Sequence, residues 1–229
     1  MRQRRPQDVV AAGYDRMAAR YAEWQAHIVG DPRDAYVERL LARLPRGPDI
    51  LEIGSGAGVE PTPTLTKRGR LVGVDISRAQ IERARAVVPG AQFIHGDIAE
   101  ASFGDETFDA VVALFVLTHI PTAVLPGLLH RISGWLRPGG SFLATFSSAG
   151  PHDEFDDDWL GVPMFFSGFA PNTNEALVEA TEMRVLESRV EPTEEPEGEV
   201  NFHWLLAEKP GRSRLSRASE SRPLRRCLP

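Results

Sequence analysis

The spacing of apolar residues changes along this chain, and each change marks a predicted element. Residues 7–28 carry apolar and aromatic side chains at helical spacing, which predicts a helix. Tyr36, Leu40 and Leu44 continue this spacing after Pro32, a residue that suits an early helical position. The N-terminal part of the chain is therefore expected to form two helices.

Short apolar runs then alternate with further helical patterns. The runs predict buried strands at residues 49–53, 70–75, 91–94, 108–115 and 141–146. A first helix of this part is expected to begin around residues 61–64, because Pro61 and Pro63 suit only a first turn. A second should run from Ser77, an N-cap with a capping box, as far as residue 88. A third should span about 122–136. Such alternation is typical of a parallel sheet with helices on both faces.

The pattern changes after residue 147. We expect an irregular segment over 148–171, a helix near 173–182, a strand near 184–190, an acidic turn over 191–199 and a last strand over 200–207. The predicted fold is α/β and Rossmann-like: a doubly wound, mostly parallel seven-stranded sheet with an antiparallel edge hairpin and N-terminal capping helices.

Length and charge define the expected organisation. The 229 residues suit one domain over 1–208, with cap helices over 1–45, a substrate-side insertion over 148–171 and a basic, disordered tail over 209–229. The net charge is −6, although residues 210–229 hold six arginines and one glutamate. The body is thus acidic, which disfavours a nucleic-acid partner.

The composition indicates in which cellular compartment the protein is expected. No apolar run approaches the roughly 20 residues of a membrane span, and no apolar segment of a signal peptide follows the basic N-terminus. The single cysteine, Cys227, suits a reducing compartment. We expect a cytoplasmic monomer or homodimer that binds neither membrane nor nucleic acid.

The stretch from Glu52 to Gly58, Glu-Ile-Gly-Ser-Gly-Ala-Gly, is the most informative motif. It follows a predicted strand, and glycine lets a backbone turn tightly and approach a ligand. A second strand ends in Asp75, about twenty residues later. In doubly wound domains such a loop and carboxylate hold an adenosine-bearing cofactor, the carboxylate at the ribose.

Five motifs in this order resemble those of class I S-adenosylmethionine-dependent methyltransferases that modify small molecules. They are Glu52-Ile-Gly-Ser-Gly-Ala-Gly58, Gly73-Val-Asp-Ile-Ser77, His95-Gly-Asp-Ile98, Phe108-Asp-Ala-Val-Val112 and Leu136-Arg-Pro-Gly-Gly140. The resemblance covers about residues 8–208. It implies transfer of a methyl group to an O, N, S or C atom of a small acceptor. The chain departs from it at Pro61 and Pro63, which remove two backbone donors after the loop.

The resemblance implies a set of cofactor-binding residues. They are Tyr14, Tyr21, Glu52, Gly54, Ser55, Gly56, Gly58, Asp75, Ile76, Gln80, Asp97, Ile98, Leu114 and Phe115. Each has a structural alternative: a tight turn for the glycines, a helix cap for Asp75, a solvated strand end for Glu52, a turn for Asp97 and core packing for the apolar and aromatic residues.

Acceptor-side residues follow from position. Trp24, His119, Trp159, Met164, Phe165 and Phe166 are expected to line the acceptor pocket, with roofing of the core as the alternative. His119 lies beyond the fourth strand and is the candidate general base, although a structural hydrogen bond would equally explain it. The acidic cluster at 153–158 is interpreted as solvated surface, so no metal is expected.

Two other function classes stay open. An NAD(P)-dependent oxidoreductase shares the half-fold and the ribose carboxylate, although its glycine loop is usually G-x-G-x-x-G. A non-catalytic protein that binds S-adenosylmethionine would show the same motifs without turnover.

Overall fold

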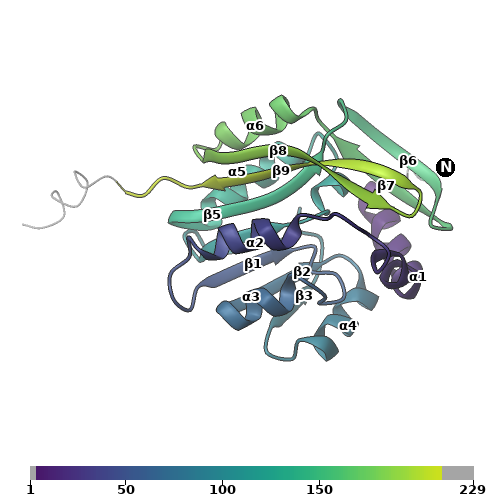
Figure 1. Ribbon diagram of the computed structural model, residues 1–229, viewed down its shortest axis with the longest axis horizontal. Coiled ribbons are helices and arrows are strands. Elements are labelled where there is room, and N and C mark those ends of the chain that lie inside the picture. Colours follow the sequence, from purple (N-terminus) through teal and green to yellow (C-terminus); the bar gives the residue numbers. More distant parts are fainter. Residues whose placement is uncertain (1–3, 213–229) are drawn as a thin grey trace, which may run out of the picture.

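The computed structural model describes residues 4–212 and contains a seven-stranded sheet (Figure 1). The strand order is β3-β2-β1-β4-β5-β9-β8, and β9 runs antiparallel to the other strands of this sheet. The strands are β1 (Asp49–Ile53), β2 (Arg70–Asp75), β3 (Gln92–His95), β4 (Phe108–Ala113), β5 (Leu136–Ser147), β8 (Arg184–Glu195) and β9 (Gly198–Glu208). The predicted Rossmann-like architecture with an antiparallel edge hairpin is confirmed.

Helices cover both faces of this sheet. The helix bounds are α1 (Pro6–Gln25), α2 (Arg33–Leu41), α3 (Thr62–Arg68), α4 (Arg78–Val87), α5 (Leu125–Trp135) and α6 (Pro171–Glu179). Leu40 of α2 and Leu65 of α3 pack in one buried cluster, whereas Ile132 of α5 and Val178 of α6 pack in another. The central strands are buried on both sides because each side has its own apolar layer.

One end of the molecule carries a second, smaller sheet. Strands β6 (His152–Trp159) and β7 (Val162–Gly168) form an antiparallel hairpin, which lies with α1 at the same end of the molecule in Figure 1. Val10 and Met17 of α1 pack against Met164 and Phe165 of β7. Helix α1 and the hairpin together build a roof over this end of the main sheet.

The predicted irregular segment at 148–171 was therefore wrong. Strand β7 buries Val162, Met164 and Phe165 in the cluster that it shares with α1, whereas the acidic side chains of β6 are exposed to solvent. The predicted acidic turn at 191–199 was also wrong, because β8 and β9 continue to Glu195 and Gly198. Acidic side chains are tolerated there on the solvent face of the hairpin.

Other bounds differ by a few residues. Strand β4 ends at Ala113, two residues before the prediction, because Phe115 adopts a left-handed backbone with φ of 57°. Strand β5 begins at Leu136 and bulges through the Pro-Gly-Gly segment before its regular pairing starts at Ser141. Helix α5 starts at Leu125, with Pro126 in its first turn.

The chain ends add two findings. Lys209 Nζ donates to the carbonyls of Ser133 and Leu136, and Arg212 pairs with Glu106, so the first residues of the predicted tail contact the body. The rest of that tail, including Cys227, lies outside the described residues. Within residues 4–212, no helix has the length and apolar character needed to span a membrane.

Candidate functional site

A first cavity opens where β1, β2 and β4 end, and most of the predicted cofactor residues line it. The parallel strands deliver their following loops to this one edge of the sheet. Of the predicted set, the lining includes Tyr14, Tyr21, Glu52, Gly54, Ser55, Gly56, Asp75, Ile76, Gln80, Asp97, Ile98, Leu114 and Phe115. Gly58 is the exception. A Cβ there would meet the backbone of Ala84 at 3.0 Å, so this glycine serves the packing of the loop on α4.

Asp75 ends β2 and holds the glycine loop in place. Its Oδ2 accepts from the Gly56 N–H at 2.9 Å, and its Oδ1 accepts from the Ser77 N–H at 2.8 Å. Burial raises the pKa of Asp75 to about 6, so the carboxylate still predominates at neutral pH. Each oxygen keeps a second lone pair for a ligand hydroxyl.

Ser77 caps α4 as predicted, but the capping box is incomplete. The Ser77 hydroxyl accepts from the Gln80 N–H, and Asp75 takes the N–H that a capping-box side chain would have used. The Gln80 side chain instead lines the cavity, and its Oε1 is buried without a partner among the described residues. This prediction was half right because a nearer carboxylate competes for the same donor.

Among the residues that line the first cavity alone, three buried polar atoms have no partner within the described residues. They are Glu52 Oε2, Ser55 Oγ and Gln80 Oε1. Burial raises the pKa of Glu52 to about 8, which keeps its carboxyl group largely protonated at neutral pH. Unsatisfied buried polar atoms are costly, so their convergence on one cavity indicates a polar ligand.

Gly54 is required where the loop passes the segment that follows β4. It has φ of 73°, and a Cβ there would lie 2.6 Å from the Cβ of Val116. Only glycine avoids that overlap. Farther along the edge, Asp97 Oδ1 accepts from the Ala99 N–H at 2.8 Å, so this residue both stabilises its turn and lines the cavity.

A second cavity of about 540 Å³ adjoins the first. Tyr14, Tyr21, Arg33, Phe115 and His119 line both, so these side chains form the boundary between them. The volume suits a small organic molecule.

Three of the predicted acceptor residues, Trp24, Trp159 and Phe166, line the second cavity with His119. Met164 and Phe165 do not: both are buried in the cluster that joins β7 to α1, with 0% and 2% exposure. The structure shows their alternative as a core roof: as neighbours in β7 they point to opposite faces of the strand, and both positions are buried.

His119 lies at the boundary and is held by two hydrogen bonds. Its Nδ1 is 2.7 Å from the Phe165 carbonyl, which can only accept, so Nδ1 carries the proton. Its Nε2 lies 2.9 Å from the Tyr14 hydroxyl and accepts from it. Burial lowers the pKa of His119 to about 4, so the ring is neutral at physiological pH.

Sequence reasoning missed Arg33 and Glu195, two of the charged residues that line the second cavity. Arg33 donates to Asp31 at 2.7 Å and lies 5.1 Å above the Phe115 ring, while its Nε is buried without a partner among residues 4–212. Glu195 lines the second cavity from the end of β8. Glu195 lies two residues after the buried Thr193, and residues two apart in a strand share a face. Interpreting this segment as a strand would therefore have indicated that Glu195 points inward.

The acidic cluster on β6 faces outward. Asp153 accepts from the N–H and hydroxyl of Thr122, and Asp157 pairs with Arg4 at 2.8 Å. No group of three or more candidate metal ligands occurs among residues 4–212.

Sequence and structure comparisons relate the chain to known methyltransferases. Residues 50–140 match the family model of a methyltransferase domain. This span contains the glycine loop, Asp75 and Asp97. The chain is similar to the S-adenosylmethionine-dependent methyltransferases, and the span that matches the family model covers less than half of it. The buried unpartnered atoms beside Asp75 fit the polar groups of S-adenosylmethionine, the cofactor of these relatives.

Individual relatives match only in part. A probable S-adenosylmethionine-dependent methyltransferase of Mycolicibacterium smegmatis is 32% identical over 114 residues, which are 49% of this chain and 43% of the relative. A sterol 24-C-methyltransferase of Gibberella zeae is 30% identical over 155 residues, 62% of this chain and 35% of the relative. The chain thus spans less than half the length of these curated relatives.

A solved structure matches more completely. It is the 1,6-didemethyltoxoflavin-N1-methyltransferase of Burkholderia thailandensis with bound 1,6-didemethyltoxoflavin and S-adenosylhomocysteine. Its TM-score is 0.68, it covers 92% of both chains, and it is 19% identical. At that identity it shows the shared fold of the methyltransferase.

Proposed function

We propose that this chain transfers a methyl group from S-adenosylmethionine to a small-molecule acceptor. The observation that supports it most is the pair of adjoining cavities, which share a boundary at Tyr14 and His119. One cavity presents the Asp75 carboxylate and unpartnered polar atoms, and the other presents aromatic side chains. A methyl transfer needs two ligands that meet at such a boundary.

In this proposal Asp75 accepts hydrogen bonds from the two ribose hydroxyls, because a carboxylate matches a vicinal diol with its two oxygens. Gly54, Gly56 and Ser55 supply the close-passing loop, and Gln80 and Glu52 supply polar contacts from the cavity wall. Asp97 and Ile98 meet the adenine from the opposite side. Tyr14, Tyr21, Leu114 and Phe115 close the methionine end.

When bound, S-adenosylmethionine supplies an activated sulfonium methyl group that an acceptor O, N, S or C atom displaces in line. The residues of the chain mainly hold the acceptor in line and exclude water, and such positioning is worth up to roughly 7–11 kcal/mol in favourable systems. Helix α1 and the β6–β7 hairpin form the roof that keeps water out.

His119 has an indirect role in this proposal. Its Nε2 is occupied by the Tyr14 hydroxyl, so the group that faces an acceptor is the tyrosine. A proton released by an acceptor would pass to the Tyr14 oxygen as the tyrosine gives its own proton to His119. Since burial lowers the pKa of His119 to about 4, it is a weak base and we expect its contribution to be modest.

The test combines binding and turnover. Calorimetry should show S-adenosylhomocysteine binding, and a panel of small acceptors should release S-adenosylhomocysteine from S-adenosylmethionine. Binding of NADH in place of the nucleoside would favour the oxidoreductase alternative. Normal nucleoside binding with no methylated product from a broad panel would favour the non-catalytic alternative. A cytoplasmic location and a monomeric or homodimeric state stay predictions.

A further inference from the structure

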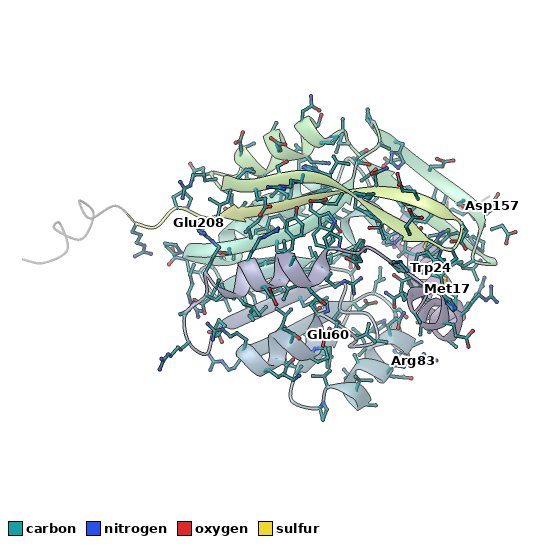
Figure 2. The ribbon with its side chains drawn as sticks, in the orientation of Figure 1. Met17, Trp24, Glu60, Arg83, Asp157 and Glu208 are labelled. Atoms are coloured by element: carbon teal, nitrogen blue, oxygen red, sulfur yellow. The ribbon has the colours of Figure 1, made fainter. Side chains whose placement is uncertain are left out.

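The second cavity has an aromatic wall built from two distant parts of the chain. Tyr21 and Trp24 of α1 stack with ring centroids 5.6 Å apart, and Trp159 of β6 meets Trp24 edge-on at 5.9 Å. Trp24 Nε1 donates to Glu197 Oε2 at 2.8 Å, which ties α1 to the β8–β9 turn. Figure 2 shows Trp24 at the same end of the molecule as Asp157 of β6. We call Tyr21, Trp24 and Trp159 the aromatic wall.

The same cavity carries an excess of carboxylates. Asp31, Glu195 and Glu199 line it, and among the described residues of its lining Arg33 is the one lysine or arginine. Arg33 is already bonded to Asp31 at 2.7 Å. Within residues 4–212, neither Glu195 nor Glu199 takes part in any of the ion pairs.

Glu195 is the more enclosed of these two carboxylates, since it is half-buried and Glu199 is exposed. Burial and then repulsion from Glu197 raise the pKa of Glu195 to about 7. A carboxyl group without a counter-charge, partly removed from water, gains most from a ligand that brings a cation.

We propose that the second cavity recognises an acceptor that carries a protonated amino group. Glu195 is the counter-charge of that group, and the aromatic wall packs against the apolar part of the acceptor and turns a ring face towards its cation. This inference rests on the proposed function and specifies its substrate class. Ring faces attract ammonium groups, and a carboxylate adds a charge-assisted hydrogen bond. An anionic acceptor would meet the carboxylates of Glu195 and Glu199, and the charge of Arg33 is already balanced by Asp31, although its Nε has no partner among residues 4–212.

Three matched probes test the charge preference. Phenethylamine, phenethyl alcohol and hydrocinnamate share a phenyl ring and differ in the charge of the other end. Calorimetry at neutral pH, with S-adenosylhomocysteine present, should give phenethylamine an affinity about tenfold above that of the alcohol, as expected for a charged hydrogen bond. Hydrocinnamate should bind most weakly.

The variant Glu195→Gln should remove the preference for phenethylamine over phenethyl alcohol. The matched control is Glu194→Gln, which makes the same charge change one residue away, at an exposed side chain outside the cavity lining. The control should keep the wild-type preference. The wild-type comparison of the three probes stands without any variant, so it remains decisive even if Glu195→Gln does not fold.

Equal binding of the probes, stronger binding of hydrocinnamate, no binding of any probe, or loss of the preference in both variants would overturn the inference. Each sample is also titrated with S-adenosylhomocysteine. Retained nucleoside binding with no charge preference would refute only the amine inference, whereas absent nucleoside binding would refute the proposed function.

Discussion

The Tyr14 hydroxyl donates to His119 Nε2 across 2.9 Å, joining α1 to the segment after β4 at the boundary of two cavities. The contact depends on a neutral imidazole, because a protonated Nε2 could not accept. Burial lowers the pKa of His119 to about 4 and thereby keeps this acceptor available. At this pair the roof, the first cavity and the second cavity meet.

Tyr14→Phe should lower turnover by roughly tenfold while S-adenosylhomocysteine affinity changes little, because the variant removes a hydroxyl and keeps the ring. Steady-state kinetics with any acceptor found by the panel would measure this. Tyr36→Phe is a control, since Tyr36 is buried in another cluster and its hydroxyl lies 3.3 Å from Glu191. Unchanged kcat in Tyr14→Phe would exclude the hydroxyl from the reaction.

Asp75→Asn should weaken S-adenosylhomocysteine binding by about tenfold or more, because an amide supplies only one accepting oxygen to a diol. The fold should survive, since the remaining oxygen can still accept one of the two backbone N–H groups. Calorimetry would measure the affinity and urea unfolding the stability. Glu82→Gln on the exposed face of α4 serves as control. Wild-type affinity in Asp75→Asn would remove this residue from ribose binding.

The stability of the protein should depend on pH through His119. The pKa of this imidazole is about 4 in the folded protein, against an ordinary value of 6.5, so the folded protein binds fewer protons between these values. This contribution to stability is fully present above about pH 6.5 and is lost as the pH falls towards 4, on the order of 3 kcal/mol in all.

The measurement compares urea unfolding of wild type and His119→Gln between pH 4 and pH 7. The variant should be relatively more stable at the acid end. Buried acids such as Asp75 make the protein more stable as the pH falls, whereas His203 makes it less stable, as His119 does. Both residues are present in wild type and variant, so their contributions cancel when the two free energies of unfolding are subtracted. A pH-independent difference would contradict the burial of a neutral imidazole.

Gly54→Ala should destabilise the protein by about 1–3 kcal/mol and weaken nucleoside binding, because it adds strain at φ of 73° and a clash with Val116. Gly127→Ala in α5 is the matched control. A Cβ at Gly127 would meet no atom within 4 Å, so this change should be neutral or slightly stabilising. Equal melting temperatures for Gly54→Ala and wild type would show that the loop relaxes.

The amino-acid sequence alone determined the parts that depend on neighbouring residues. The strand before Gly54, the carboxylate at the end of β2 and the Ser77 cap are local patterns, because apolar period, glycine and a capping side chain act within a few residues. Strand alternation with helices then dictates a parallel sheet, which brings Asp75 and Asp97 to one edge.

Tertiary structure decided what depends on distant partners. Tyr14 and His119 are 105 residues apart, and only the docking of α1 on β7 brings them together. The same docking buried Met164 instead of exposing it to an acceptor. The inward position of Glu195 followed from its pairing in a long hairpin, and no local pattern distinguishes such a strand from an acidic turn, because long-range pairing supplies its stability.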